Sequence, residues 1–308
     1  MAHRALASAW RVAEACSSPR RYPGSRRSPS LARARLPARC RSASRATETL
    51  EENADAASLR EHYEREGWVV VRGVADAALV DALHAATDAL EEEAKTFTRS
   101  RRHRGVFFET QSASGRKSDD AIRAGALRKI GSPSKRGGAF AALVRSERIR
   151  DIALKVCLSE TNSTLRCAVD QVNTKAPFSE GSGFAWHQDA SFLKPIARDE
   201  FDAFGGVNVV VAMDESDSQN GGFEVLGRTH REGEAPKSLR DAYDGAVESV
   251  SALQKQKPLF DESFRVCPAL LPGDAVFFHP MLAHGSGRNP SARRRRIATL
   301  WYVAHREG

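Results

Sequence analysis

Long hydrophobic runs and paired cysteines are missing from this sequence. No stretch of its 308 residues approaches the roughly 20 apolar residues of a membrane-spanning helix, so no membrane span is predicted. The five cysteines form no CxxC pair and are odd in number, which indicates neither a disulfide framework nor a zinc knuckle and fits a reducing compartment. Hydrophobic residues still make up 41% of the chain, so we expect a globular protein with one substantial core or two small ones.

Acidic residues and lysine are almost missing from the first 46 residues. This segment contains 11 arginines, no lysine and one acid, Glu14, so the formal net charge of +8 of the whole chain originates here. A composition rich in arginine, serine and alanine and poor in acids is typical of an organellar transit peptide. We expect residues 1–46 to be a disordered targeting segment and residues 47–308 to form the folded domain. The destination would be the mitochondrion or a plastid, and without such targeting the protein would be cytoplasmic.

The basic segment has a second interpretation, a disordered arm that binds nucleic acid or an acidic partner. Aromatic side chains for base stacking are nearly absent from it, which favours targeting. We therefore predict no nucleic-acid partner. The last four residues, HREG, are not a peroxisomal address.

The first part of the domain has mainly helical patterns. ASLREHYEREG predicts a helix that ends at Gly67, and WVVVRG predicts a buried strand. Asp76 can cap a second helix, in which apolar residues recur at helical spacing. Residues 94–136 are polar and basic with few periodic apolar positions, so we predict loops there. A further helix is expected from about Ala139 to Cys157.

Beyond residue 160, short apolar or alternating runs replace the helical periods. Five segments predict strands: LRCAVDQVN, VNVVVAM, GFEVL, AVFFH and RIATLWYVA. ESDSQNGG and LPGDA between them are turn sequences. Many short strands with such turns indicate a sandwich or a barrel. The economical interpretation is one mainly β domain with flanking helices.

Residues 184–192, FAWHQDASF, place a histidine and an aspartate one residue apart. On a strand or at its edge, residues i and i+2 point to the same side, so His187 and Asp189 can direct an imidazole and a carboxylate at one point. A lone pair of this kind is usually a satisfied turn pair, but the downstream segment PGDAVFFHPMLAHGSGRNPS supplies His284 after another apolar run. Two histidines and one carboxylate form the facial triad of non-haem Fe(II) oxygenases, which leaves positions open for cosubstrate and oxygen.

Motifs around these residues extend the pattern. WHQD at residues 186–189, NGGFEVLGRTH, PGDAVFFHPMLAHGSGRN and the earlier REGWVVVRGV follow one another along the chain. They resemble the WHQD segment, the NG...PGSH turn, the PGD...HxxxxHGSGxN block and the opening strand of the phytanoyl-CoA dioxygenase family of Fe(II)/2-oxoglutarate oxygenases. The resemblance covers about Glu61 to Tyr302. It implies a double-stranded β-helix, a cupin-like jelly roll with helices packed outside.

The same resemblance implies the residues of the site. The catalytic iron ligands would be His187, Asp189 and His284. The 2-oxoglutarate contacts would be Arg295 and Ser286 at the distal carboxylate, with Lys129 and Gln171 as further contacts. Arginine suits this task because its planar, permanently charged fork meets a carboxylate with two hydrogen bonds.

The implied function is that of an Fe(II)- and 2-oxoglutarate-dependent dioxygenase. It would hydroxylate a small organic or lipid-derived substrate and release succinate and CO2. Its partners would be 2-oxoglutarate, O2 and a small-molecule substrate, and the protein would be a monomer or a weak homo-oligomer. Residues 97–128 and 231–262, which we expect to form the pocket, carry no pattern that names the substrate. Lipid acyl thioesters, small metabolites and amino-acid derivatives all remain open.

Two alternative functions explain the sequence less well. A related halogenating enzyme would carry a small residue in place of the carboxylate ligand, so Asp189 argues against it. A non-catalytic jelly-roll binding module is the alternative from another class, and it would not explain the triad together with Arg295.

Arg295 lies in the run RRRR, and such a run is usually a solvated face or a polyanion patch. On a strand, however, alternate side chains point in opposite directions, so Arg295 and Ile297 share one face while Arg294 and Arg296 take the other. We expect one buried arginine among exposed ones. Arg293 is the alternative should the register be shifted.

The chain also departs from the family's pattern. Gly227 and Arg228 replace the Pro-Gly of the turn, and Val210 stands where some members carry a tryptophan. His230 and His279 are additional histidines near the motifs. We expect both to be hydrogen-bonding structural residues and not a fourth metal ligand.

Overall fold

Two antiparallel β-sheets form the framework of the computed structural model, which describes residues 56–112, 122–158, 164–179, 182–234 and 261–305. The larger sheet has the strand order β1-β10-β7-β12-β5-β4-β3-β2, and the smaller one the order β6-β11-β8-β9. The predicted transit peptide, residues 1–46, lies outside the described residues. The mainly β architecture predicted from the sequence is confirmed.

The strands of the larger sheet are β1 (Trp68–Val71), β2 (Arg101–His103), β3 (Val106–Ser112), β4 (Ile122–Gly131), β5 (Thr164–Lys175), β7 (Gly206–Ala212), β10 (Ala275–Phe278) and β12 (Arg295–His305). Those of the smaller sheet are β6 (Phe184–His187), β8 (Glu224–Leu226), β9 (Arg265–Val266) and β11 (His284–Ser286). The five strands predicted beyond residue 160 are confirmed as β5, β7, β8, β10 and β12, with small shifts of their ends.

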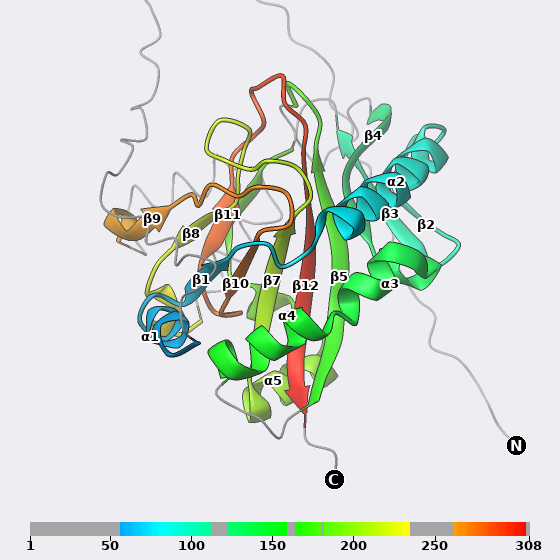
Figure 1. Ribbon diagram of the computed structural model, residues 1–308. Helices are drawn as coiled ribbons and strands as arrows, with labels where there is room; N and C mark the ends of the chain where they lie inside the picture. Colours follow the sequence, from blue (N-terminus) through cyan, green and yellow to red (C-terminus); the bar gives the residue numbers. More distant parts are fainter. Residues whose placement is uncertain (1–55, 113–121, 159–163, 180–181, 235–260, 306–308) are drawn as a thin grey trace, which may run out of the picture. The chain divides into compact units, whose positions relative to one another are not determined.

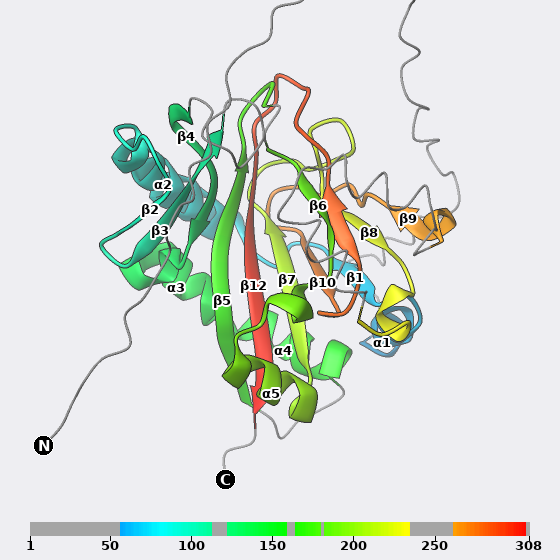
Figure 2. The ribbon, with the colours of Figure 1, turned by 180° about the vertical axis from the view of Figure 1, so that it is seen from behind.

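Five α-helices accompany the sheets in the described ranges: α1 (Ala56–Glu66), α2 (Ala77–Ala94), α3 (Gly138–Val144), α4 (Glu147–Ile152) and α5 (Pro195–Phe204). Figure 1 shows α3 and α4 in front of the larger sheet, and Figure 2, seen from behind, shows β6, β8 and β11 on its other side. The larger sheet is therefore the middle layer. None of these helices is long and apolar enough to cross a bilayer.

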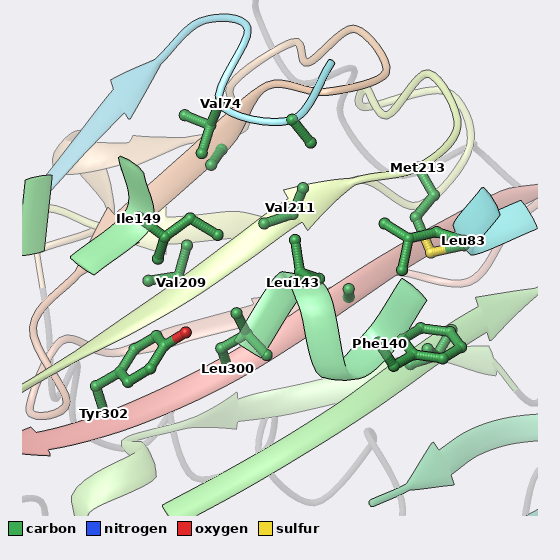
Figure 3. Close-up of a cluster of buried hydrophobic side chains, with 14 of the residues drawn as sticks. Val74, Leu83, Phe140, Leu143, Ile149, Val209, Val211, Met213, Leu300 and Tyr302 are labelled. Atoms are coloured by element: carbon green, nitrogen blue, oxygen red, sulfur yellow. The ribbon is translucent and has the colours of Figure 1, made fainter. Parts of the chain in front are cut away.

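The two faces of the larger sheet bury different clusters because successive side chains of a strand alternate. On the helical side, Val209, Val211 and Leu300 pack with residues of α3 and α4 such as Leu143 and Ile149 (Figure 3). On the other side, a second cluster fills the space between the sheets, where residues of the larger sheet meet Val225 of β8 and the preceding Phe223: Val210, Ala212, Val276, Phe278 and Ile297. β7 is consequently buried along its whole length.

The two predicted helices at the start of the domain are confirmed with their ends. Gly67 follows α1 with φ +82°, a conformation that glycine adopts without strain, and its amide donates to the Tyr63 carbonyl at 2.7 Å. The Asp76 side chain accepts from the Leu79 amide at 2.8 Å and caps α2.

The loops predicted for residues 94–136 were wrong, because β2, β3 and β4 lie there. Val106 and Phe108 alternate inward and are fully buried, so a period of two is present in the short run VFFET. The strands were missed because they form the outer part of the sheet, where polar and basic side chains meet water on one face and mask the alternation.

The single helix predicted from Ala139 to Cys157 was also wrong in its continuity. Ser146 has the non-helical backbone angles φ −55° and ψ 116°, and its side chain accepts from the Ile149 amide at 3.4 Å, so it separates the two helices and caps the second. A π-helical turn, Ala153–Leu158, then completes the segment. Helical periodicity could not reveal this break, because the apolar positions continue through it.

Candidate active site

The three candidate metal ligands come from two neighbouring strands of the smaller sheet. His187 is the last residue of β6, Asp189 follows it in a short 3-10 helix (Asp189–Phe192), and His284 is the first residue of β11. His284 and His187 are directly paired in the antiparallel register. Their ligand atoms and a carboxylate oxygen of Asp189 all lie within 4.8 Å of one another. The structure thus brings together the residues that the sequence indicated.

Each histidine is oriented by a backbone carbonyl close to it in the chain. His187 Nδ1 lies 2.7 Å from the Ala185 carbonyl oxygen, and His284 Nδ1 lies 2.9 Å from that of Leu282. With Nδ1–H donating to the carbonyl, the lone pair is on Nε2, and the two Nε2 atoms each lie 3.4 Å from an Asp189 oxygen. The imidazoles are therefore held in the tautomer that ligates a metal through Nε2.

Asp189 is buried and oriented by a residue of the larger sheet. The side-chain amide of Asn208 donates to Asp189 Oδ2 at 2.6 Å. Burial opposes ionisation of the carboxyl, but His284 and His187 hold the pKa of Asp189 well below its usual range. Burial and the neighbouring His284 lower the pKa of His187. A carboxylate beside a neutral imidazole is the protonation state that a divalent metal ion requires of its ligands.

This donor set fits the metal that the sequence indicates. Two imidazole nitrogens and one carboxylate oxygen are the ligands of non-haem Fe(II) centres with open coordination positions. The three side chains are buried or nearly so, which keeps bulk water from competing.

A cavity of about 170 Å³ extends from the triad along the inner face of the larger sheet. It is lined by Lys129, Gln171, Asn173, Phe184, His187, Asp189, Phe192, Val210, Phe223, Phe278, His284, Gly285, Ser286, Arg295, Ile297, Thr299 and Trp301. All seven residues predicted for the site are among them. The four β12 residues in this lining are alternate ones, as the strand register predicts.

Arg295 lies at one end of that row and is only 1% exposed. Its Nη2 donates to the Gly221 carbonyl at 2.7 Å, while Nε and Nη1 have no hydrogen-bond partner in the described part of the chain. Burial lowers the pKa of Arg295 to about 10, so the guanidinium stays charged at neutral pH. A buried cation with two unused donors on a cavity wall fits a ligand carboxylate.

Lys129 and Gln171, two further predicted contacts of 2-oxoglutarate, lie on β4 and β5 in the wall of the cavity. Gln171 on β5 is directly paired with Thr299 on β12. Lys129 on β4 is directly paired with Asn173 on β5. Lys129 Nζ lies 2.9 Å from Glu109 Oε2. Burial opposes ionisation of Glu109, yet Lys129 and Arg128 keep its pKa below the usual value. Lys129 is therefore a neutralised cation, in contrast to Arg295.

Trp301 and Phe192 line the part of the cavity away from Arg295, and the ring of Phe192 lies against that of His187, with centroids 5.8 Å apart. Trp301 is paired with Asn208, the residue that orients Asp189. Six residues of strand separate Trp301 from Arg295, about 20 Å at the usual rise. The cavity therefore has a cationic end at Arg295 and an aromatic end at Trp301.

The prediction of one buried arginine among exposed ones was partly wrong, because Arg296 is also buried, at 7% exposure. Its Nε lies 3.0 Å from Asp214 Oδ2 and its Nη1 2.7 Å from Asp88 Oδ1, on the helical side of the sheet. Arg293 and Arg294 are more exposed; the first pairs with Asp217, and the second with Glu91 and Asp88. The predicted alternation between Arg295 and Arg296 holds, but acids from α2 and from the segment after β7 allow the second arginine to be buried.

None of the positions that depart from the family's pattern is one of the three ligands. Val210 lines the cavity. Arg228 has φ +71°, and its Nη2 lies 3.0 Å from Glu66 Oε1. His279 Nδ1 accepts from the Met281 amide at 3.1 Å, and His230 Nε2 lies 3.3 Å from the Glu64 carbonyl. Both histidines lie outside the triad, in line with structural roles.

Three residues of the site were missed by sequence reasoning. Asn208 is the one polar side chain in the apolar run VNVVVA, a signal that could have been used. Trp301 shares the cavity face of β12 with Arg295 and could have been found by extending the alternation. Lys175, whose contacts are described below, stands at the end of a predicted strand, where lysine is usually exposed and gives no signal.

Comparison with known proteins agrees with this geometry. Residues 63–297 match the family described as Phytanoyl-CoA dioxygenase (PhyH). A probable alpha-ketoglutarate-dependent hypophosphite dioxygenase from Stutzerimonas stutzeri is 28% identical over 58% of this chain and 57% of its own length. The peroxisomal phytanoyl-CoA dioxygenase of Rattus norvegicus is 34% identical over 38% of this chain and 32% of its own length. The chain thus spans little more than half of the first relative and about a third of the second.

Solved structures of the same fold are known. The crystal structure of EctD from S. alaskensis with 2-oxoglutarate and 5-hydroxyectoine has a TM-score of 0.56 and 20% sequence identity, and the match covers 81% of this chain and 76% of that one. The predicted double-stranded β-helix is confirmed by this likeness. The predicted cofactors, Fe(II) and 2-oxoglutarate, agree with those named for neighbouring structures.

Proposed function

The chain belongs to the phytanoyl-CoA dioxygenase family, and from this premise we propose that it is an Fe(II)- and 2-oxoglutarate-dependent dioxygenase that hydroxylates a small organic or lipid-derived substrate. One observation carries the proposal. The triad of His187, Asp189 and His284 shares a single cavity with Arg295, a buried cation with unused donors.

The three triad side chains would hold the iron. Bound there with 2-oxoglutarate, the metal supplies the oxidising chemistry, in which O2 and 2-oxoglutarate yield succinate, CO2 and one oxygen atom for the substrate. The protein's own contribution is the arrangement around it. Asn208 fixes the carboxylate ligand, and the carbonyls of residues 185 and 282 fix the imidazoles.

Arg295 would bind the distal carboxylate of 2-oxoglutarate through a bidentate, charge-assisted pair. Ser286, on the same wall, would donate to that carboxylate, and Lys129 and Gln171 would contact the remainder of the molecule. With its distal carboxylate at Arg295, the cosubstrate would direct its 2-oxo acid group toward the metal. The aromatic end, with Phe192 and Trp301, is left for the substrate.

The substrate class stays broad in this proposal. The names of the relatives refer to an inorganic anion in one case and to a lipid thioester in the other. An aromatic wall beside the metal favours a substrate whose reacting carbon belongs to an apolar group. We therefore keep small organic and lipid-derived substrates together until turnover distinguishes them.

Binding followed by turnover tests the proposal. Anaerobic calorimetry of the full chain with Fe(II) should show saturable binding of 2-oxoglutarate, and Asp189→Ala should bind neither iron nor cosubstrate at the site. Succinate release should then be stimulated by one substrate class among acyl-CoAs, small metabolites and amino-acid derivatives, with one oxygen atom added to the product. Wild-type protein that binds no 2-oxoglutarate would instead support the non-catalytic binding module.

We also propose that residues 1–46 direct the protein to a mitochondrion or a plastid, on the strength of their arginine-rich, acid-poor composition. Fused to a fluorescent protein, they should send it to an organelle and be removed there. A diffuse signal from an uncleaved fusion would contradict this. The monomeric or weakly oligomeric state predicted from the sequence is checked by light scattering of the same preparation.

A further inference from the structure

Lys175, the last residue of β5, is 0% exposed. Its ammonium group donates to the Gly221 carbonyl at 2.8 Å, to the Ser286 hydroxyl oxygen at 2.7 Å and to the Gly287 carbonyl. All three acceptors are neutral. In the described part of the chain no carboxylate forms an ion pair with Lys175. A buried ammonium without an anion is strongly unfavourable, so its presence calls for an explanation.

A second buried cation lies beside it. Lys175 and Arg295 are directly paired in the β5–β12 ladder, and both donate to the Gly221 carbonyl, Arg295 at 2.7 Å. Burial and the charge of Arg295 lower the pKa of Lys175 well below its usual range. Arg295, too, forms no ion pair with a described acid. A lysine and an arginine therefore share one carbonyl, and an anion that enters the cavity would favour the charged form of both.

Ser286 connects Lys175 to the cavity. Lys175 is not among the residues that line it, whereas Ser286 is. A hydroxyl has one proton to donate, and the Ser286 oxygen already accepts from Lys175. Its proton is consequently free to point elsewhere, and the open side of Ser286 is the cavity. The lysine thus fixes Ser286 as a donor toward an anion.

We propose that Lys175 is a positioning residue of the 2-oxoglutarate site, which holds Ser286 as a donor and adds a second positive charge behind the distal carboxylate. The inference rests on the proposed function, since it takes 2-oxoglutarate as the anion. It extends that function because it makes the chain selective for 2-oxo diacids over 2-oxo acids without a distal carboxylate. Arg295 contacts the carboxylate directly, and Lys175 acts through Ser286 and through its charge.

The experiment compares two 2-oxo acids in the iron-loaded protein without oxygen. 2-Oxoglutarate carries the distal carboxylate, and 2-oxobutyrate has the same 2-oxo acid group without it. Calorimetry gives a dissociation constant for each. Lys175→Met keeps an unbranched side chain that is one atom shorter and removes its charge. Arg294→Met is the matched control, because it removes a nearby cation that pairs with Glu91 on the other side of the sheet.

Lys175→Met should weaken 2-oxoglutarate binding by on the order of tenfold to a hundredfold, the range for one hydrogen bond that involves a charged group. Its affinity for 2-oxobutyrate should equal that of the wild type. The double variant with Ser286→Ala should lose less than the two single losses combined, because the residues act as a unit. Arg294→Met should leave both constants unchanged.

Two results would overturn the inference: equal weakening for both acids, which indicates support of the fold alone, or no weakening for either. Failure of the wild-type protein to bind 2-oxoglutarate would instead refute the proposed function, so the two failures are distinguishable. Thermal unfolding checks that each variant is folded. If Lys175→Met does not fold, Lys175→Gln and Ser286→Ala carry the test. Each must then lose 2-oxoglutarate affinity and keep that for 2-oxobutyrate.

Discussion

Arg295 and Arg296 are neighbours on β12, and both are buried, but they lie on opposite faces of the larger sheet. Arg296 meets Asp214 and Asp88 on the helical side, so its counter-ions belong to the fold. On the cavity side, Arg295 donates to the Gly221 carbonyl and is the strand partner of Lys175. No described acid forms an ion pair with it. The comparison teaches that a buried cation supplied with acids stabilises the structure, whereas one left without them is available for a ligand anion.

The largest effect is expected for Arg295→Ala, which removes the cation of the cavity face. The distal carboxylate of 2-oxoglutarate would lose its charged partner, which costs about 2–5 kcal/mol by analogy with truncated interfacial ion pairs. Calorimetry should show the dissociation constant rise by about 30-fold to several thousand-fold. Iron binding should persist, because the triad is untouched. If Arg293→Ala or Arg294→Ala gave this rise instead, the assignment of the face would be wrong.

Arg296→Ala should have the opposite profile, a loss of stability without a loss of cosubstrate affinity. It would remove the arginine from Asp214, beside which His84 Nε2 remains at 3.0 Å, and we expect the free energy of unfolding to fall by about 1–3 kcal/mol. This is below the roughly 3–5 kcal/mol of fully buried pairs, because the second acid, Asp88, is 61% exposed. Urea unfolding measures the change. If stability stayed unchanged and 2-oxoglutarate binding weakened, Arg296 would be a ligand-binding residue like Arg295, and the assignment of the two faces would be wrong.

The pH dependence of stability sharpens the comparison further through Lys175. Its folded-state pKa is lowered, whereas an unfolded lysine keeps its proton up to about pH 10.4. Between these values the unfolded chain binds more protons, so the contribution of Lys175 to stability should increase as pH rises. Urea unfolding of the cosubstrate-free protein at several alkaline pH values should show this increase relative to Lys175→Met. A difference between the two proteins that stays constant with pH would contradict a strained, buried ammonium.

The smallest effect on stability is expected for Arg228→Gly, because Arg228 is an exposed arginine. Arg228 has φ +71°, a region that favours glycine, and it pairs with Glu66 at the surface. Glycine would relieve backbone strain and lose the ion pair, so the two changes offset each other. The midpoint of thermal unfolding should move less than in any variant above, as a thermal melt can show. A large destabilisation would mean that this turn depends on the arginine itself.

Sequence reasoning reached the cavity face of β12 because an alternating period is simple geometry. His187, Asp189 and Arg295 are placed by local pattern and by the motif that surrounds them, and the structure puts them in one cavity. The burial of Arg296 could not be predicted from the alternation of side chains. It depends on Asp88 of α2 and on Asp214, which approach only through tertiary packing.

Two other features were hidden for different physical reasons. Lys175 is buried, although lysine is usually exposed. Its ammonium group donates to the carbonyls of Gly221, before β8, and Gly287, after β11. The strands β2 to β4 were missed because their exposed face is polar and basic. For Lys175 the deciding contacts are distant in sequence, so no local propensity reports them.

The pairing of β6 with β11 has a consequence for how the chain folds. It joins His187 to His284 across most of the second half of the domain, so the ligand set does not exist until a long loop has closed. A metal ion cannot gather these three ligands in an early, locally structured intermediate. Iron added to a refolding chain should therefore leave the folding rate unchanged and slow unfolding, since it binds what only the completed fold contains.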